Sequence, residues 1–170
     1  MENVRPHHIT MHGYIYQVFE EPAQESDWAS YETALDCLNL LPVADSVDPV
    51  ENRGKAIRRF GTWLEQNQLG MLLDTFFILD KMAADRYFEG RYKAFHKVTA
   101  TLHTLTEEQY IHEHGHVQEM IDELRRTFCD PFRDYLLLGE TVQPITLDEF
   151  IRTAEPGVRY YIGGVLDYHS

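Results

Sequence analysis

Both ends of this chain carry the residue pattern of a β-strand, and the segment between them has mainly helical signals. His8–Phe19 and Val158–Tyr168 are rich in β-branched and aromatic residues. Gly163-Gly164 within the second segment indicates a bulge. We therefore expect an α+β fold, a mostly helical single domain with a small antiparallel sheet formed by the N- and C-terminal strands. A β-hairpin within His8–Phe19 is the alternative, because Gly13 lies near its middle.

Several interior segments carry helix-start signals or apolar residues at helical spacing. Two of the predicted helices begin with a capping box, at Thr106-Glu-Glu-Gln109 and at Thr146-Leu-Asp-Glu149. The predicted helices are Ser26 or Asp27 to about Leu40, Asp48 to about Gln68, Met71–Phe88, a segment after Gly90, Thr106 to about Arg126, Asp130 to Gly139, and a short helix from Thr146 that ends before Pro156.

The charge of the chain is large and unevenly distributed. The 170 residues include 28 acidic and 15 basic residues, a formal net charge of −13 with histidine neutral. Residues 1–51 carry −9, residues 52–97 carry +4 and residues 98–170 carry −8. If the basic and acidic segments pack together, their fields largely cancel; if they form separate faces, an acidic face would attract a basic protein groove. Direct binding to nucleic acid is disfavoured, because phosphate binding requires a net basic domain.

The composition is that of a globular protein, with 44% apolar and 25% charged residues. Two cysteines cannot form a disulfide framework, and no secretory signal or long apolar run is present, so we expect a cytoplasmic protein without a membrane span. No nucleophile elbow, Walker A loop or dinucleotide fingerprint is present, and we expect no cofactor.

A histidine cluster offers the clearest alternative chemistry. His112, Glu113 and His116 form the string H-E-x-x-H, in which two histidines one helical turn apart could bind zinc and the glutamate could act as general base. These five residues resemble the zincin metalloprotease motif, which implies a zinc-dependent hydrolase. His114 stands where that motif has a bulky apolar residue, and the usual third ligand is missing, although Glu119 could complete an improvised set.

A helical core stripe competes with this metal site. If Tyr110, His114 and Val117 face the core, His112 and His116 lie on the solvated face, and we assign no metal ligands. His7, His8 and His12 could form another site near the N-terminus, but solvated histidines are the default there.

We therefore expect a non-enzymatic acidic interaction protein that occupies the basic groove of a nucleic-acid-binding protein or nuclease. Its size and charge are similar to those of the nucleic-acid mimics of mobile genetic elements, the anti-CRISPR and antirestriction proteins. A homodimeric regulatory subunit is a further alternative. The acids expected to face the partner lie opposite apolar helix stripes, where they could instead pair with Arg53, Arg58 and Arg59. They are Glu25, Glu32 and Asp36 in one row and Glu108, Glu119, Asp122 and Glu123 in a second row.

Overall fold

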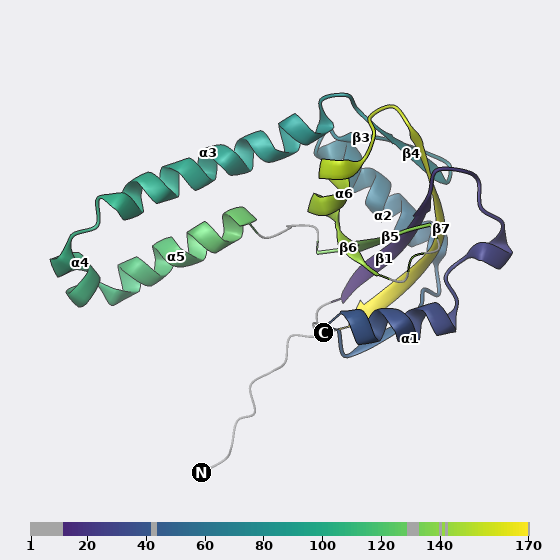
Figure 1. The fold of residues 1–170 in the computed structure, drawn as a ribbon, viewed down its shortest axis with the longest axis horizontal. Coiled ribbons are helices and arrows are strands. Elements are labelled where there is room, and N and C mark those ends of the chain that lie inside the picture. Colours follow the sequence, from purple (N-terminus) through teal and green to yellow (C-terminus); the bar gives the residue numbers. More distant parts are fainter. Residues whose placement is uncertain (1–11, 42–43, 129–132, 140, 142, 170) are drawn as a thin grey trace, which may run out of the picture.

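The protein is built around a mixed, seven-stranded central sheet (Figure 1). The computed structural model describes residues 12–41, 44–128, 133–139, 141 and 143–169. The strand order is β3-β4-β7-β1-β5-β6, and β2 pairs with β7 outside this path. The strands are β1 (His12–Phe19), β2 (Ser46–Pro49), β3 (Gly70–Leu73), β4 (Phe76–Leu79), β5 (Tyr135–Leu138), β6 (Ile145–Thr146) and β7 (Arg159–His169).

The prediction of a small antiparallel sheet made by the terminal strands is wrong, because the sheet is large, mixed and central. Strands β1 and β7 do pair antiparallel, from His12 opposite His169 to Phe19 opposite Tyr161. Strand β1 also pairs in parallel with β5, and β7 also pairs with β2 and β4. The alternative hairpin is not formed within the described residues, because β1 runs without a break from residue 12; residues 8–11 lie outside them.

The helices begin where short polar side chains can cap them. Ser30, Asn52, Thr106 and Thr146 each accept a hydrogen bond from the backbone of the first helical turn. Both predicted capping boxes are confirmed. The helices are the 3₁₀ helix η1 (Glu25–Asp27), α1 (Tyr31–Leu40), α2 (Arg53–Gln66), α3 (Ala83–His103), α4 (Glu107–His112), α5 (His114–Phe128) and α6 (Leu147–Thr153).

Three predicted helices are wrong in part because short strands replace them. Asp48 and Pro49 belong to β2, where proline is tolerated since the strand pairs on one side only. The segment predicted as a helix from Met71 contains the β3–β4 hairpin and only the first part of α3. In the segment predicted as a helix from Asp130, residues 135–138 form β5, and residues 129–132 lie outside the described part.

The two faces of the sheet are covered by different helices. On one face, Cys37 and Leu41 of the α1 region pack with Ile15 and Leu166. On the other face, α2 and α6 share a larger aromatic cluster with the sheet, and the first turns of α3 join it. Burial of these apolar side chains on both faces provides the main stabilisation of the sheet.

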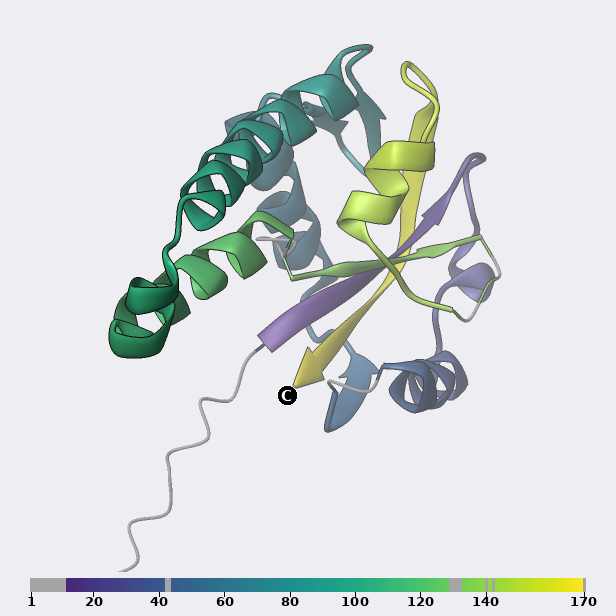
Figure 2. The ribbon, with the colours of Figure 1, turned by 60° about the vertical axis from the view of Figure 1, so that its left-hand side comes forward.

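Helices α3, α4 and α5 form a helical arm that extends from the sheet (Figures 1 and 2). At its base, Arg91 of α3 donates to Asp148 of α6 at 2.6 Å and to the Thr127 carbonyl of α5 at 3.1 Å. This largely buried ion pair therefore ties both long helices of the arm to the body. In the described part of the chain, none of the helices combines the length and apolar character needed to cross a bilayer.

Candidate functional site

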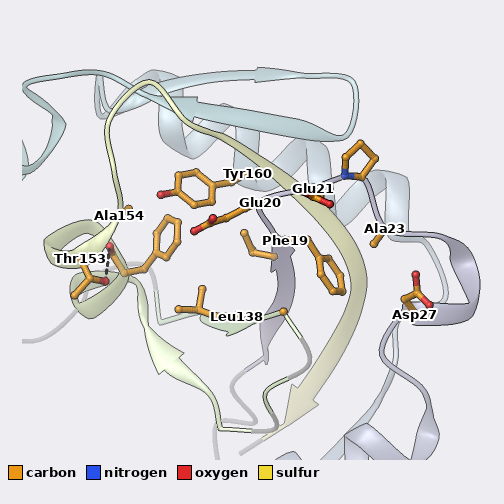
Figure 3. A pocket seen from close by; sticks show the side chains of 13 residues that line it. Phe19, Glu20, Glu21, Ala23, Asp27, Leu138, Thr153, Ala154 and Tyr160 are labelled. Carbon is orange, nitrogen blue, oxygen red and sulfur yellow. Dashed lines mark hydrogen bonds between the residues drawn. The ribbon is translucent and has the colours of Figure 1, made fainter.

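A pocket of about 620 Å³ opens where β1 and β5 end, and we call it the β1/β5 pocket (Figure 3). Because these strands are parallel, their carboxyl ends meet at one edge of the sheet, and the antiparallel strand β7 begins there. Ligand sites of open α/β sheets form at this edge. Phe19 of β1, Leu138 of β5, Phe150 of α6 and Tyr160 of β7 contribute to its walls.

The β1/β5 pocket combines aromatic walls with an acidic rim. The Phe150 and Tyr160 rings meet edge to face with centroids 5.0 Å apart. Three carboxylates, those of Glu20, Glu21 and Asp27, line the opening, and Figure 3 shows Glu20 beside Tyr160. None of the described residues that line the pocket is basic. Aromatic faces and carboxylates both attract organic cations, so this lining suits an amine or a guanidinium group.

Tyr160 is held in its neutral form at the wall of the pocket. Burial raises the pKa of the Tyr160 hydroxyl, and the negative charge of Glu20 acts in the same direction. The hydroxyl oxygen accepts a hydrogen bond from the Glu155 backbone at 2.8 Å, which acts in the opposite direction on the pKa. This bond and the stacked Phe77 ring, 5.5 Å away, fix Tyr160, which is only 4% exposed, so this wall of the pocket is rigid before a ligand binds.

Gln17 joins the two sides of the pocket from beneath. Its side-chain nitrogen donates to the carbonyls of Asp27 at 3.1 Å and Gly139 at 3.3 Å, and both of these residues line the pocket. Its side-chain oxygen accepts from the backbone nitrogens of Ala29 at 2.7 Å and Gly164 at 3.2 Å. The amide is buried, so these four hydrogen bonds satisfy its polar atoms.

The predicted irregularity at Gly163-Gly164 allows this arrangement. The register between β1 and β7 shifts there, so that Tyr16 lies opposite Val165 and Val18 lies opposite Ile162. A Cβ atom on Gly164 would lie 2.5 Å from the Ala29 nitrogen. Glycine is therefore required for the chain after η1 to approach β7 this closely.

Replacing Gln17 by leucine is expected to lower the free energy of unfolding by about 2–3 kcal/mol, because backbone groups now bonded to the amide would stay buried without partners. Chemical denaturation of the wild type and of Gln17→Leu measures this difference. Gln66→Leu, at an exposed position at the end of α2, is the matched control and should change stability by less than about 1 kcal/mol. Equal stability of all three proteins would show that the Gln17 bonds contribute nothing.

The seven predicted partner-facing acids lie on separate parts of the molecule. Glu25 lies on η1 and Glu32 and Asp36 on α1, whereas Glu108 lies on α4 and Glu119, Asp122 and Glu123 on α5. Figure 1 places α1 against the sheet and α4 at the far end of the arm, so the two rows do not form one track. All seven except the half-buried Asp122 are exposed, and Asp122 accepts from Arg125 at 3.3 Å.

The basic residues of α2 are partly used inside the fold. Arg59 donates to the buried carboxylate of Asp134 at 2.5 Å, outside both predicted acidic rows. Arg53 stacks on the Trp28 ring with its guanidinium carbon 4.0 Å from the centroid, and it donates to two carbonyls of β7. Burial lowers the pKa of Arg53, and the negative charge of Glu25 acts in the opposite direction. Arg58 is exposed. Some of the basic middle segment is therefore neutralised by other parts of the chain.

The H-E-x-x-H residues are separated by a helix break. His112 ends α4, and Glu113 has φ −107° and ψ 45°, outside the helical region, before α5 begins at His114. His112 and His116 are therefore not on one continuous helix face. Together with Glu119 they do not form a metal-ligand group, whereas His12, Asp167 and His169 do, among the described residues. His7 and His8 lie outside the described part of the chain.

Sequence reasoning missed the three carboxylates of the pocket. The available signal was Glu20-Glu21-Pro22 directly after a predicted strand, because acids at a strand end are positioned by the sheet. No protein-family model, curated protein or solved structure matches this chain, so the site is defined by its own geometry.

Proposed function

We propose that this protein is a non-enzymatic binding protein that occupies the basic groove of a nucleic-acid-binding protein or nuclease. The observation that carries the proposal is the β1/β5 pocket, in which Glu20, Glu21 and Asp27 surround an aromatic-walled cavity with no basic residue in its described lining. A lysine or arginine side chain of the partner would fill the pocket, with its apolar stem against the rings and its charge at the rim.

The overall charge supports this function. A net charge of −13 creates an attractive field for a basic surface and raises the association rate. The same field opposes the approach of nucleic acid, which would compete for the partner groove. Because the acidic rows on α1 and on the arm lie apart, the pocket supplies the specific contact and the rows contribute to long-range attraction.

The pocket is tested by removing two of its charges. Glu20→Gln/Glu21→Gln should weaken binding of N-acetyl-arginine amide by at least about tenfold, since it removes two charges next to the bound cation. The matched control is Glu32→Gln/Asp36→Asn on α1, which changes the net charge equally but lies outside the pocket lining. NMR titration measures both affinities and should show shifted amides at Phe19 and Leu138 in the wild type. Equal affinities of the two double variants would contradict the proposed site.

The partner class is tested with the same proteins as baits. A basic nuclease or nucleic-acid-binding protein retained from a lysate should bind the wild type and the control variant, be lost with the pocket variant, and be released by added duplex DNA. Its affinity should fall steeply with salt, because charge interactions are screened beyond about 10 Å at 0.1 M. A retained protein that ignores both salt and DNA would contradict occupation of a basic groove.

A further inference from the structure

Two histidines and an aspartate meet at the other end of the β1–β7 pair, and we call them the His–Asp–His cluster. His12 lies directly opposite His169 in the register, and Tyr14 lies opposite Asp167. Because side chains alternate along a strand, Asp167 and His169 project from the same face of the sheet as His12. One potential ligand atom from each of the three lies within 4.8 Å of those of the other two.

The spacing of these atoms suits ligands that share one ion. His12 Nδ1 lies 3.4 Å from one Asp167 oxygen, and His169 Nε2 lies 3.9 Å from the other. The first contact is a long hydrogen bond, and the second is beyond hydrogen-bond distance. Two ligands bonded to one tetrahedral zinc ion at about 2.1 Å lie about 3.4 Å apart. Small side-chain adjustments would therefore bring all three groups into coordination.

The cluster opens onto a cleft that would leave part of an ion accessible. This cleft has a volume of about 540 Å³, and Asp167 and His169 form part of its wall. Asp48 of β2 also lines the cleft and lies opposite Asp167 in the sheet register. Asp48 is outside the group of close ligand atoms, and from the cleft wall it can accept a hydrogen bond from a water molecule on the ion. Three protein ligands and an open position are the arrangement of reactive rather than purely structural metal sites.

We propose that His12, Asp167 and His169 bind a divalent transition-metal ion of the Zn²⁺ class, with its free coordination position facing this cleft. A site with two imidazoles and one carboxylate binds such ions in preference to Ca²⁺ or Mg²⁺, which take oxygen ligands. The site revises the expectation that the chain holds no metal, and it uses none of the H-E-x-x-H residues. It is also independent of the proposed partner binding, because the β1/β5 pocket lies at the opposite end of β1.

The untagged, chelator-treated chain should bind one Zn²⁺ ion with micromolar or tighter affinity in isothermal titration calorimetry. His12→Ala/His169→Ala should weaken binding by more than about 100-fold, because loss of a partner outside the coordination sphere alone costs about 10–100-fold. Asp167→Asn keeps the shape of the side chain and should weaken binding through the lost charge. Bound Co²⁺ should give visible absorption that disappears in the His12→Ala/His169→Ala variant.

His112→Ala/His116→Ala is the matched control, because it also removes two histidines and should leave zinc affinity unchanged. Circular dichroism establishes that each variant is folded before titration. Zinc binding that survives in His12→Ala/His169→Ala, or that is lost in His112→Ala/His116→Ala, would overturn the proposed ligand set. Failure of the wild type to bind at millimolar Zn²⁺ would overturn the site altogether.

Discussion

Replacing Phe77 by alanine is expected to lower the free energy of unfolding by about 3–5 kcal/mol, the usual cost of deleting a fully buried aromatic ring. Phe77 of β4 has 0% of its surface exposed. Its ring centroid lies 5.1 Å from Phe60, 5.5 Å from Tyr160 and 5.8 Å from Phe150. The substitution would leave a cavity between the sheet, α2 and α6 that these rigid neighbours cannot fill. Urea denaturation monitored by circular dichroism measures the loss.

Phe128→Ala is the matched control for this experiment. The substitution is the same, but Phe128 of α5 is 66% exposed, so the expected change is less than about 1 kcal/mol. If both variants lost similar amounts of stability, the hydrophobic core would not be confined to the sheet and the helices that cover it. Because Phe150 and Tyr160 also line the β1/β5 pocket, Phe77→Ala should in addition weaken cation binding in the fraction that stays folded.

Elements with strong local signals were predicted from the sequence, and elements held mainly by neighbouring strands were not. The capping boxes at Thr106 and Thr146 act through hydrogen bonds three residues apart, so sequence alone locates these helix starts. Most of β7 was also predicted, because eleven consecutive residues carry its pattern. Strands β2 and β4, which pair with β7, and β5, which pairs with β1, have four residues each. This length is too short for alternation to be distinguished from a helical stripe.

The missed β3–β4 hairpin shows why an apolar run alone is ambiguous. Gly70 lies between the predicted helix that ends near Gln68 and the one that begins at Met71. In the structure, a Cβ atom on Gly70 would lie 2.0 Å from the Ile78 carbonyl oxygen of the paired strand. Asp74 at the turn has φ 57°, a left-handed conformation that aspartate tolerates better than most residues. Both signals become meaningful only when the pairing of Gly70 with Leu79 is known.

The candidate sites depend on contacts between distant parts of the sequence, and for this reason they could not be predicted in full. The β1/β5 pocket joins residues near Glu20 to residues near Leu138, Phe150 and Tyr160. His12 meets Asp167 and His169 only because β1 and β7 are paired at the end where His12 lies opposite His169. A pairing of the terminal strands was anticipated, but its register was not, and the register decides which side chains meet.

Stability is expected to fall steeply above pH 10, because Tyr16 and Tyr168 are buried and cannot ionise easily in the folded chain. Burial raises the pKa of Tyr168 to about 12, and the nearby Tyr135 and Asp134 act in the same direction. Burial also raises the pKa of Tyr16, and Asp134 contributes to the shift. Both hydroxyls donate to backbone carbonyls, Tyr16 to Ala56 at 3.1 Å and Tyr168 to Arg133 at 2.6 Å.

The sign of the effect follows from proton linkage. In the unfolded chain both tyrosines lose their protons near pH 10, whereas the folded chain keeps them until the raised pKa values are reached. The stabilisation by these groups is thus complete below pH 10 and is lost as the pH rises through about 12 for Tyr168 and above that for Tyr16. Within this window the free energy of unfolding should fall by about 1.4 kcal/mol per pH unit for each tyrosine.

Urea denaturation at a series of pH values between about 9 and 12 measures the slope. Tyr16→Phe removes one ionisable hydroxyl and should reduce this slope by about 1.4 kcal/mol per pH unit relative to the wild type. Tyr110→Phe is the matched control, since Tyr110 on α4 is 66% exposed and its environment changes little on unfolding. If the free energy of unfolding of Tyr16→Phe and of Tyr110→Phe fell equally with pH, Tyr16 would ionise equally in the folded and unfolded chains. Its burial against α2 would then not oppose ionisation.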